Sequence, residues 1–222
     1  MTKLWIGILL VLVSTLAAAQ EEVKWSGALK VWNASATIKG NGGAVSYDTY
    51  SSSAGNLSLT GKKNDLLIVV STLLPTSYNI DYTSTTGGYL RREDYDIALG
   101  YSFLPNISAL IGYKTLSYKA DNSSAGTYVA PYLGLTGSAL ISDKSFLYGT
   151  VIYAPNATDN NATFDDAQKF TSYELGMGFP VNGSTSLTFG YRSQELAHKY
   201  KTTQSWYSDS VRGVIFGINH NF

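Results

Sequence analysis

The sequence predicts an all-β protein, a transmembrane, antiparallel, up-and-down β-barrel of about ten strands. Three observations predict it. Large apolar residues alternate with small or polar ones along segment after segment, which is the pattern of strands with two different faces. Charged residues make up only 14% of the chain, against about 25% in an ordinary soluble domain. Short and long polar connections also alternate between the predicted strands.

The first predicted element is a signal peptide over residues 1–19, followed by a barrel domain over residues 20–222. Lys3 precedes an apolar run at residues 4–13, and Ala17-Ala18-Ala19 supplies the small residues of a cleavage site. A helix needs about 20 apolar residues to span a bilayer, so this run is too short to be a membrane anchor. The chain is therefore expected to be exported.

The strand signal is an alternation of two unlike faces, clear over residues 94–103. One face carries Tyr95, Ile97, Leu99, Tyr101 and Phe103, and the other carries Asp94, Asp96, Ala98, Gly100 and Ser102. The same contrast recurs in residues 172–181, 185–194 and 213–222. A soluble β-sandwich is the alternative, but its solvated face would carry many more charges. A small, weakly charged face suits a narrow interior, with the apolar face toward lipid.

The connections set the strand count. Short turns are predicted near residues 61–65, 104–106, 141–145 and 182–184, and longer stretches near 34–55, 75–90, 120–126, 155–169 and 201–208. Such asymmetry is typical of periplasmic turns and extracellular loops, and an even strand number places both termini on the periplasmic side. If residues 56–61 form no strand, the alternative is an eight-stranded barrel. The ten predicted strands are residues 22–33, 56–61, 65–74, 91–103, 107–119, 127–141, 145–154, 169–181, 185–200 and 209–222.

Aromatic residues on the outward faces are expected to form two girdles at the lipid boundaries. Eight residue steps of roughly 3.3 Å along a tilted strand separate Tyr95 from Phe103, a rise close to the apolar band of roughly 25 Å between girdles. The predicted periplasmic girdle holds Trp25, Phe103, Phe179 and Phe222, and the opposite girdle holds Tyr95, Tyr173 and Tyr191.

An internal repeat predicts two charge pairs in the lumen. Residues 95–101 resemble residues 173–179, and the same offset carries Lys114 onto Arg192. With the turns centred on Pro105 and Gly183, Asp96 faces Lys114 and Glu174 faces Arg192 on the inward side. The favoured interpretation is that these pairs fill the lumen and fix the strand register, because barrels of this size enclose little more than side chains. The alternative is a selectivity lining, together with Lys30, Arg92 and Asp94.

The closing segment carries a resemblance to a known family. It reads Val214-Ile215-Phe216-Gly217-Ile218-Asn219-His220-Asn221-Phe222. With the signal peptide, this strand resembles those of the small bacterial outer-membrane β-barrel proteins, over the whole mature chain. The resemblance implies a Gram-negative outer membrane, contact with its lipid, and recognition of the closing strand by the barrel assembly machinery. Phe222 would be the assembly signal, and His220 stands where a tyrosine is commoner.

Composition and motifs exclude several functions. The chain has no cysteine, so it forms neither a disulfide scaffold nor a thiolate zinc site. Sixteen basic residues balance sixteen acidic ones, which argues against nucleic-acid binding. Neither His198 nor His220 lies in a catalytic motif, and the acidic residues of the stretch 156–169 lack calcium-loop spacing. The sequence therefore predicts no catalytic residues, no cofactor and no metal site.

The predicted function is a structural or surface-interaction role in the outer membrane. Loops on a rigid scaffold are where binding residues concentrate, so residues 34–55, 75–90 and 155–169 are the expected contact regions. Tyr47 and Tyr50 in the first of them are candidate contacts for a surface ligand. The alternative function is a narrow, porin-like channel for ions or small solutes.

Overall fold

A computed structural model describes residues 23–40, 45–80, 88–120, 126–159, 168–199 and 206–222. The predicted signal peptide lies outside these residues. No helix in the described part is long and apolar enough to cross a membrane. The strands are β1 (Lys24–Gly40), β2 (Val45–Asp48), β3 (Ser52–Lys63), β4 (Leu66–Ile80), β5 (Gly88–Leu104), β6 (Ile107–Ala120), β7 (Gly126–Ser142), β8 (Ser145–Asp159), β9 (Gln168–Pro180), β10 (Thr185–Lys199) and β11 (Trp206–Asn221).

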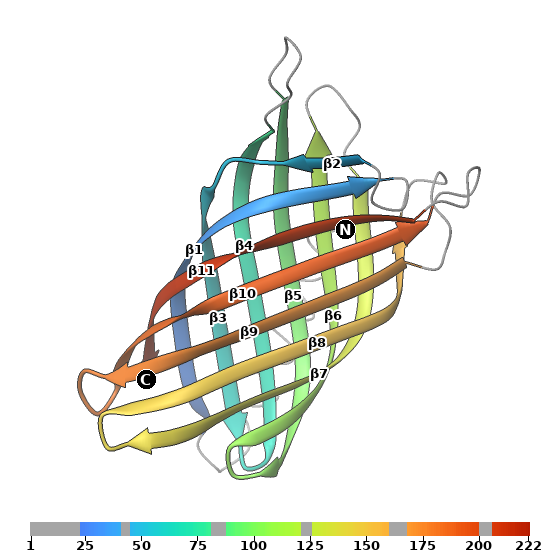
Figure 1. Cartoon of the computed structure of the whole chain (residues 1–222). Coiled ribbons are helices and arrows are strands. Elements are labelled where there is room, and N and C mark those ends of the chain that lie inside the picture. The colour runs from blue at the N-terminus through green and yellow to red at the C-terminus, as the bar shows by residue number, and fades with distance from the viewer. Residues whose placement is uncertain (1–22, 41–44, 81–87, 121–125, 160–167, 200–205) are drawn as a thin grey trace.

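Ten of the described strands close into an antiparallel, up-and-down barrel (Figure 1). Sequential strands pair with one another, and β1 pairs with β11 to complete the wall. β2 is a short additional strand that pairs only with β1. The predicted fold class and strand number are confirmed. Residues 56–61 form the middle of β3, so the eight-stranded alternative is wrong.

The two ends of the barrel differ, as Figure 1 shows. At the turn end, brief connections join β3 to β4, β5 to β6, β7 to β8 and β9 to β10. The chain terminus meets the start of β1 there, where the Phe222 amide donates to the Trp25 carbonyl at 2.9 Å. One of these turns requires a left-handed residue, Asn64 with a φ of 52°, a conformation that asparagine tolerates. The opposite end, the loop end, carries the longer connections.

The predicted long connections are partly wrong, because the strands continue further toward the loop end. The sequence predicts one loop over residues 34–55, but β1 runs to Gly40 and β3 begins at Ser52. Pairing explains the difference: β1 stays in register with β11 as far as Lys39 opposite Ser208. Polar composition resembles that of a loop, but each continued pair satisfies backbone groups that a loop would leave to water. β4 and β8 likewise extend to Ile80 and Asp159.

The outward face of the wall is apolar. Leucine, isoleucine and valine side chains are exposed on several strands, for example Ile111, Leu133 and Leu175, each more than 60% exposed. Six of the predicted girdle residues are exposed on this face: Tyr95, Phe103, Tyr173, Phe179, Tyr191 and Phe222. The rings of Tyr173 and Tyr191 lie 6.4 Å apart on adjacent strands. The seventh, Trp25, is half-buried and lies over Gly61.

The seam between β1 and β11 depends on close backbone approach. Gly213 lies opposite Ala34 in the register. A Cβ atom at Gly213 would overlap the backbone oxygen of Asn33. A backbone atom cannot turn aside as a flexible side chain can, so an added methyl group must push the two strands apart.

We predict that Gly213→Ala lowers the free energy of unfolding by about 1–3 kcal/mol, the usual cost of overpacking. Urea unfolding of the protein in lipid vesicles measures the change. Gly183→Ala is the control, because a Cβ at that turn position meets nothing within 4 Å. Equal stability of Gly213→Ala and the wild type would contradict the close approach at this seam.

Candidate functional site

The barrel interior is densely packed toward the loop end. Large side chains from six strands, all less than 2% exposed, form a plug there; its members are Trp32, Tyr78, Leu116, Phe170, Leu196 and Val211. They belong to a single cluster of buried apolar residues. Burial of their apolar surface stabilises the loop half of the barrel.

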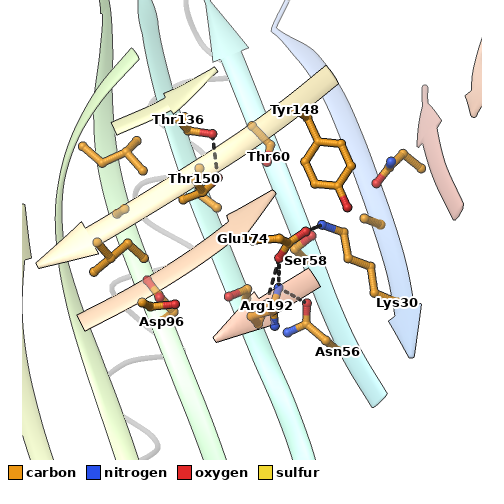
Figure 2. A pocket seen from close by; sticks show the side chains of 18 of the residues that line it. Lys30, Asn56, Ser58, Thr60, Asp96, Thr136, Tyr148, Thr150, Glu174 and Arg192 are labelled. Carbon is orange, nitrogen blue, oxygen red and sulfur yellow. Dashed lines mark hydrogen bonds and ion pairs between the residues drawn. The ribbon is translucent and has the colours of Figure 1, made fainter. Parts of the chain in front are cut away.

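The interior toward the turn end is open instead. A cavity of about 430 Å³ lies there (Figure 2). Small hydroxyl side chains line much of it, among them Ser58, Thr60 and Thr150. The lining reaches Asn221, which is exposed at the end of β11. The cavity therefore faces the turn end, and the plug lies on its other side.

Two groups of charged side chains lie between the cavity and the plug. In the first, the Arg92 cluster, the Nε and Nη2 atoms of Arg92 donate to the two carboxylate oxygens of Asp94 at 2.8 and 2.7 Å. The Nζ atom of Lys114 lies 3.4 Å from Asp94 and 3.5 Å from Asp96. Asp96 also accepts a hydrogen bond from the Tyr132 hydroxyl at 2.6 Å. Each buried charge in this cluster thus has an opposite charge beside it.

The second group, the Glu174 cluster, joins one carboxylate to two cations (Figure 2). Lys30 Nζ lies 2.6 Å from Glu174 Oε1. The Nε and Nη2 atoms of Arg192 donate to Oε2 at 2.8 and 2.5 Å. Lys30 comes from β1, whereas Glu174 and Arg192 come from β9 and β10. The pair of Lys30 and Glu174 therefore connects β1 to a strand that is not its hydrogen-bonded neighbour.

The strand register brings the predicted pairs together. Asp96 lies opposite Lys114 across β5 and β6, and Glu174 lies opposite Arg192 across β9 and β10. Gly217 lies beside Lys30 in the register, and a Cβ there would crowd the Lys30 side chain. This glycine leaves the lysine room to cross the lumen toward Glu174.

Sequence reasoning missed how the pairs are linked. It gave Lys30 no partner, yet Lys30 pairs with Glu174, 144 positions away in the chain. It also missed the contacts that join Asp94 to Lys114 and Arg92 to Gln194. The only available signal was a charge on the small-residue face of a strand. Because a lone buried charge is costly, such a charge indicates that a partner exists but does not identify it.

The two histidines do not form one site. His198 is buried inside near the loop end and stacks on Tyr128, with ring centroids 6.3 Å apart. His220 is near the turn end, where its ring lies 5.1 Å from that of Phe222. Within the described ranges, no group of three or more histidine, aspartate or glutamate side chains could hold a metal ion.

The predicted surface tyrosines lie at the loop end. Tyr50 is 61% exposed, and its amide donates to the carbonyl of Asn79 at 3.0 Å. Tyr47 belongs to β2, and its side chain is outside the described part. Tyr50 is thus held by β4 and presented to the surroundings of the barrel.

Comparisons with known proteins identify the fold. No family model and no curated protein sequence matches the chain. Among solved structures, the outer-membrane protease OmpT from Escherichia coli matches with a TM-score of 0.68 at 13% identity, over 91% of this chain and 99% of that chain. The Neisserial surface protein A, NspA, matches with a TM-score of 0.38 at 14% identity, over 91% of this chain and 100% of that one. The match with OmpT shows that the chain has the fold of a bacterial outer-membrane β-barrel.

The Arg92 cluster predicts the effect of a charge reversal. Lys114→Glu would place a third carboxylate beside Asp94 and Asp96, at the position of a cation that lies within 3.5 Å of both. We expect a loss of about 3–5 kcal/mol in unfolding free energy, because a buried pair is broken and its partners stay charged. Urea unfolding in vesicles measures the loss.

Adding Asp96→Lys tests whether the pair itself matters. The double variant should regain part of the stability but not all of it, since Asp94 stays beside the new Glu and Tyr132 loses its acceptor. A double variant no more stable than Lys114→Glu alone would contradict the pairing.

Proposed function

We propose that this chain is an integral outer-membrane protein of a Gram-negative bacterium, with a structural or surface-interaction role and no catalytic activity. The apolar outward wall supports the location, since exposed leucine, isoleucine and valine side chains on neighbouring strands suit contact with lipid. The fold shared with OmpT supports it as well. In this orientation the turn end faces the periplasm and the loop end faces the exterior of the cell.

The observation that carries the proposed role is the plug. The side chains of Trp32, Tyr78 and Phe170 are fully buried across the loop half of the interior. Beneath them, the bidentate pair of Arg92 and Asp94 is almost completely buried. A permeating ion would have to displace these packed groups, so the interior favours a closed wall over the alternative of a narrow channel.

The loop end supports a role in surface interaction. The strands continue in pairing toward this end, so exposed side chains such as Tyr50 lie on a rigid base. Binding to a rigid surface costs less ordering entropy than binding to a disordered loop. We assign the barrel assembly machinery as a partner through the closing strand and Phe222, which is 79% exposed at the turn end.

We predict that purified, folded protein adds no steady conductance to a planar lipid bilayer, because the plug fills the path through the barrel. Single-channel recording measures this, with a known porin as the positive control. A steady conductance that changes on substitution of Lys114 or Arg192 would favour the channel instead.

Cysteine labelling tests the location and the orientation, because the chain has no cysteine of its own. We expect a membrane-impermeant maleimide to label Tyr50→Cys at the loop end on intact cells. Gly183→Cys, at an exposed turn with open space around it, should be labelled only after the outer membrane is permeabilised. Labelling of Gly183→Cys alone on intact cells would reverse the orientation, and recovery of the protein in the soluble fraction would contradict the location.

A further inference from the structure

We propose that the cavity in the turn half of the barrel binds a small organic monocarboxylate, which enters from the turn end and is held by Lys30 and Arg192. The site does not depend on where the protein resides. If the proposed outer-membrane location holds, the entrance at the turn end faces the periplasm. Four features support this site: the local charge balance, the donors that remain on the two cations, the lysines at the turn end, and the size and lining of the cavity.

The two charge clusters differ in their balance. The Arg92 cluster sets two cations against two carboxylates. The Glu174 cluster sets two cations, Lys30 and Arg192, against the one carboxylate of Glu174. Its side chains are no more than 15% exposed, so water compensates the extra positive charge only in part. One bound negative charge would complete the balance.

Asp94 and Asp96 also line the cavity, but Arg92 and Lys114 already balance them. Two further inward carboxylates, Asp209 and Asp159, are too far along the wall to supply that charge. Gly217 lies beside Lys30 in the register of β1 and β11. Asp209 precedes Gly217 on β11 by eight residues, which corresponds to roughly 26 Å along a strand. Asp159 is the last residue of β8, at the loop end. The surplus charge therefore belongs to the cavity.

Both cations keep donors for a ligand. Glu174 accepts from Lys30 and from the Nε and Nη2 atoms of Arg192, and Asn56 Oδ1 accepts from Nη2 of Arg192 at 3.5 Å. A lysine ammonium has three donors and an arginine guanidinium five, so N–H groups remain on each. Figure 2 shows both side chains at the cavity, near Asn56 and Ser58. A carboxylate there could accept from both cations.

Two lysines lie on the inward side of the wall at the turn end. Lys24 and Lys62 lie directly opposite each other in the register of β1 and β3. They continue the same strand faces that bring Lys30, Asn56 and Ser58 to the cavity. Like charges in this position are destabilising, and no ion pair joins either lysine to another described residue. Such a pair attracts anions toward the opening.

The cavity itself suits a small polar acid. Its volume of about 430 Å³ is within the usual range for small-molecule sites, about 300–1,000 Å³. Hydroxyl groups of Thr60, Thr150 and Thr188 line it and could bond to hydroxyl groups of the ligand. A surplus of one charge matches a carboxylate better than a phosphate, which carries about −1.5 to −2 at pH 7.

The test is isothermal titration of the folded protein in detergent with gluconate, a monocarboxylate rich in hydroxyl groups. Sorbitol, a neutral polyol of the same chain length, is the matched probe. We expect gluconate to bind and sorbitol not to bind, and added salt to weaken the binding of gluconate. Equal binding of both probes, or no binding of gluconate, overturns the proposal.

Variants locate the binding. Lys30→Met removes the surplus charge but leaves Glu174 paired with Arg192, so we expect folded protein with at least a tenfold lower affinity. Lys30→Gln, which retains a donor toward Glu174, serves if the first variant does not fold. Lys119→Met, on an exposed position of β6, should bind as the wild type does. Unchanged affinity in the folded Lys30 variant overturns the proposal.

The titration does not depend on where the protein resides in the cell. Failure of the proposed outer-membrane location would appear in the cysteine-labelling experiment and leave the titration unaffected. Failure of the carboxylate site would appear in the titration alone.

Discussion

Closure of the hydrogen-bonded wall is the constraint on which this structure depends. An open sheet edge leaves a row of backbone groups unpaired, and the pairing of β1 with β11 removes the last two open edges. Closure also decides which side chains face inward, because the faces alternate along each strand. Close approach at the seam then requires Gly213, where a side chain would meet the neighbouring backbone.

The interior follows from this wall. Side chains that face inward must either pack or find partners, and the two halves of the barrel do so differently. Toward the loop end, Trp32 and Phe170 are buried in the plug. At mid-height, Arg92, Glu174 and their partners form ion pairs across several strands. Toward the turn end, small hydroxyl side chains leave a cavity. One barrel thus combines a packed interior toward the loop end with a cavity toward the turn end.

Contacts within one hairpin could be predicted from the sequence, and contacts between distant strands could not. The turns near Pro105 and Gly183 are readable from composition, and a turn position sets which residues of its two strands lie opposite each other. Asp96 with Lys114 and Glu174 with Arg192 are pairs of this kind. Lys30 reaches Glu174 only because β1 and β11 close the barrel. The two residues are 144 positions apart in the chain, so no local sequence pattern predicts their contact.

The amino-acid sequence alone specified the alternation of faces, the positions of the tight turns, the strand number and therefore the fold class. It did so because each of these depends on neighbours within one strand or one hairpin. Only the folded barrel sets the strand lengths toward the loop end, the plug, and the unequal charge balance around Glu174. Those features depend on which strands meet across the lumen, and barrel closure brings together side chains from opposite ends of the chain.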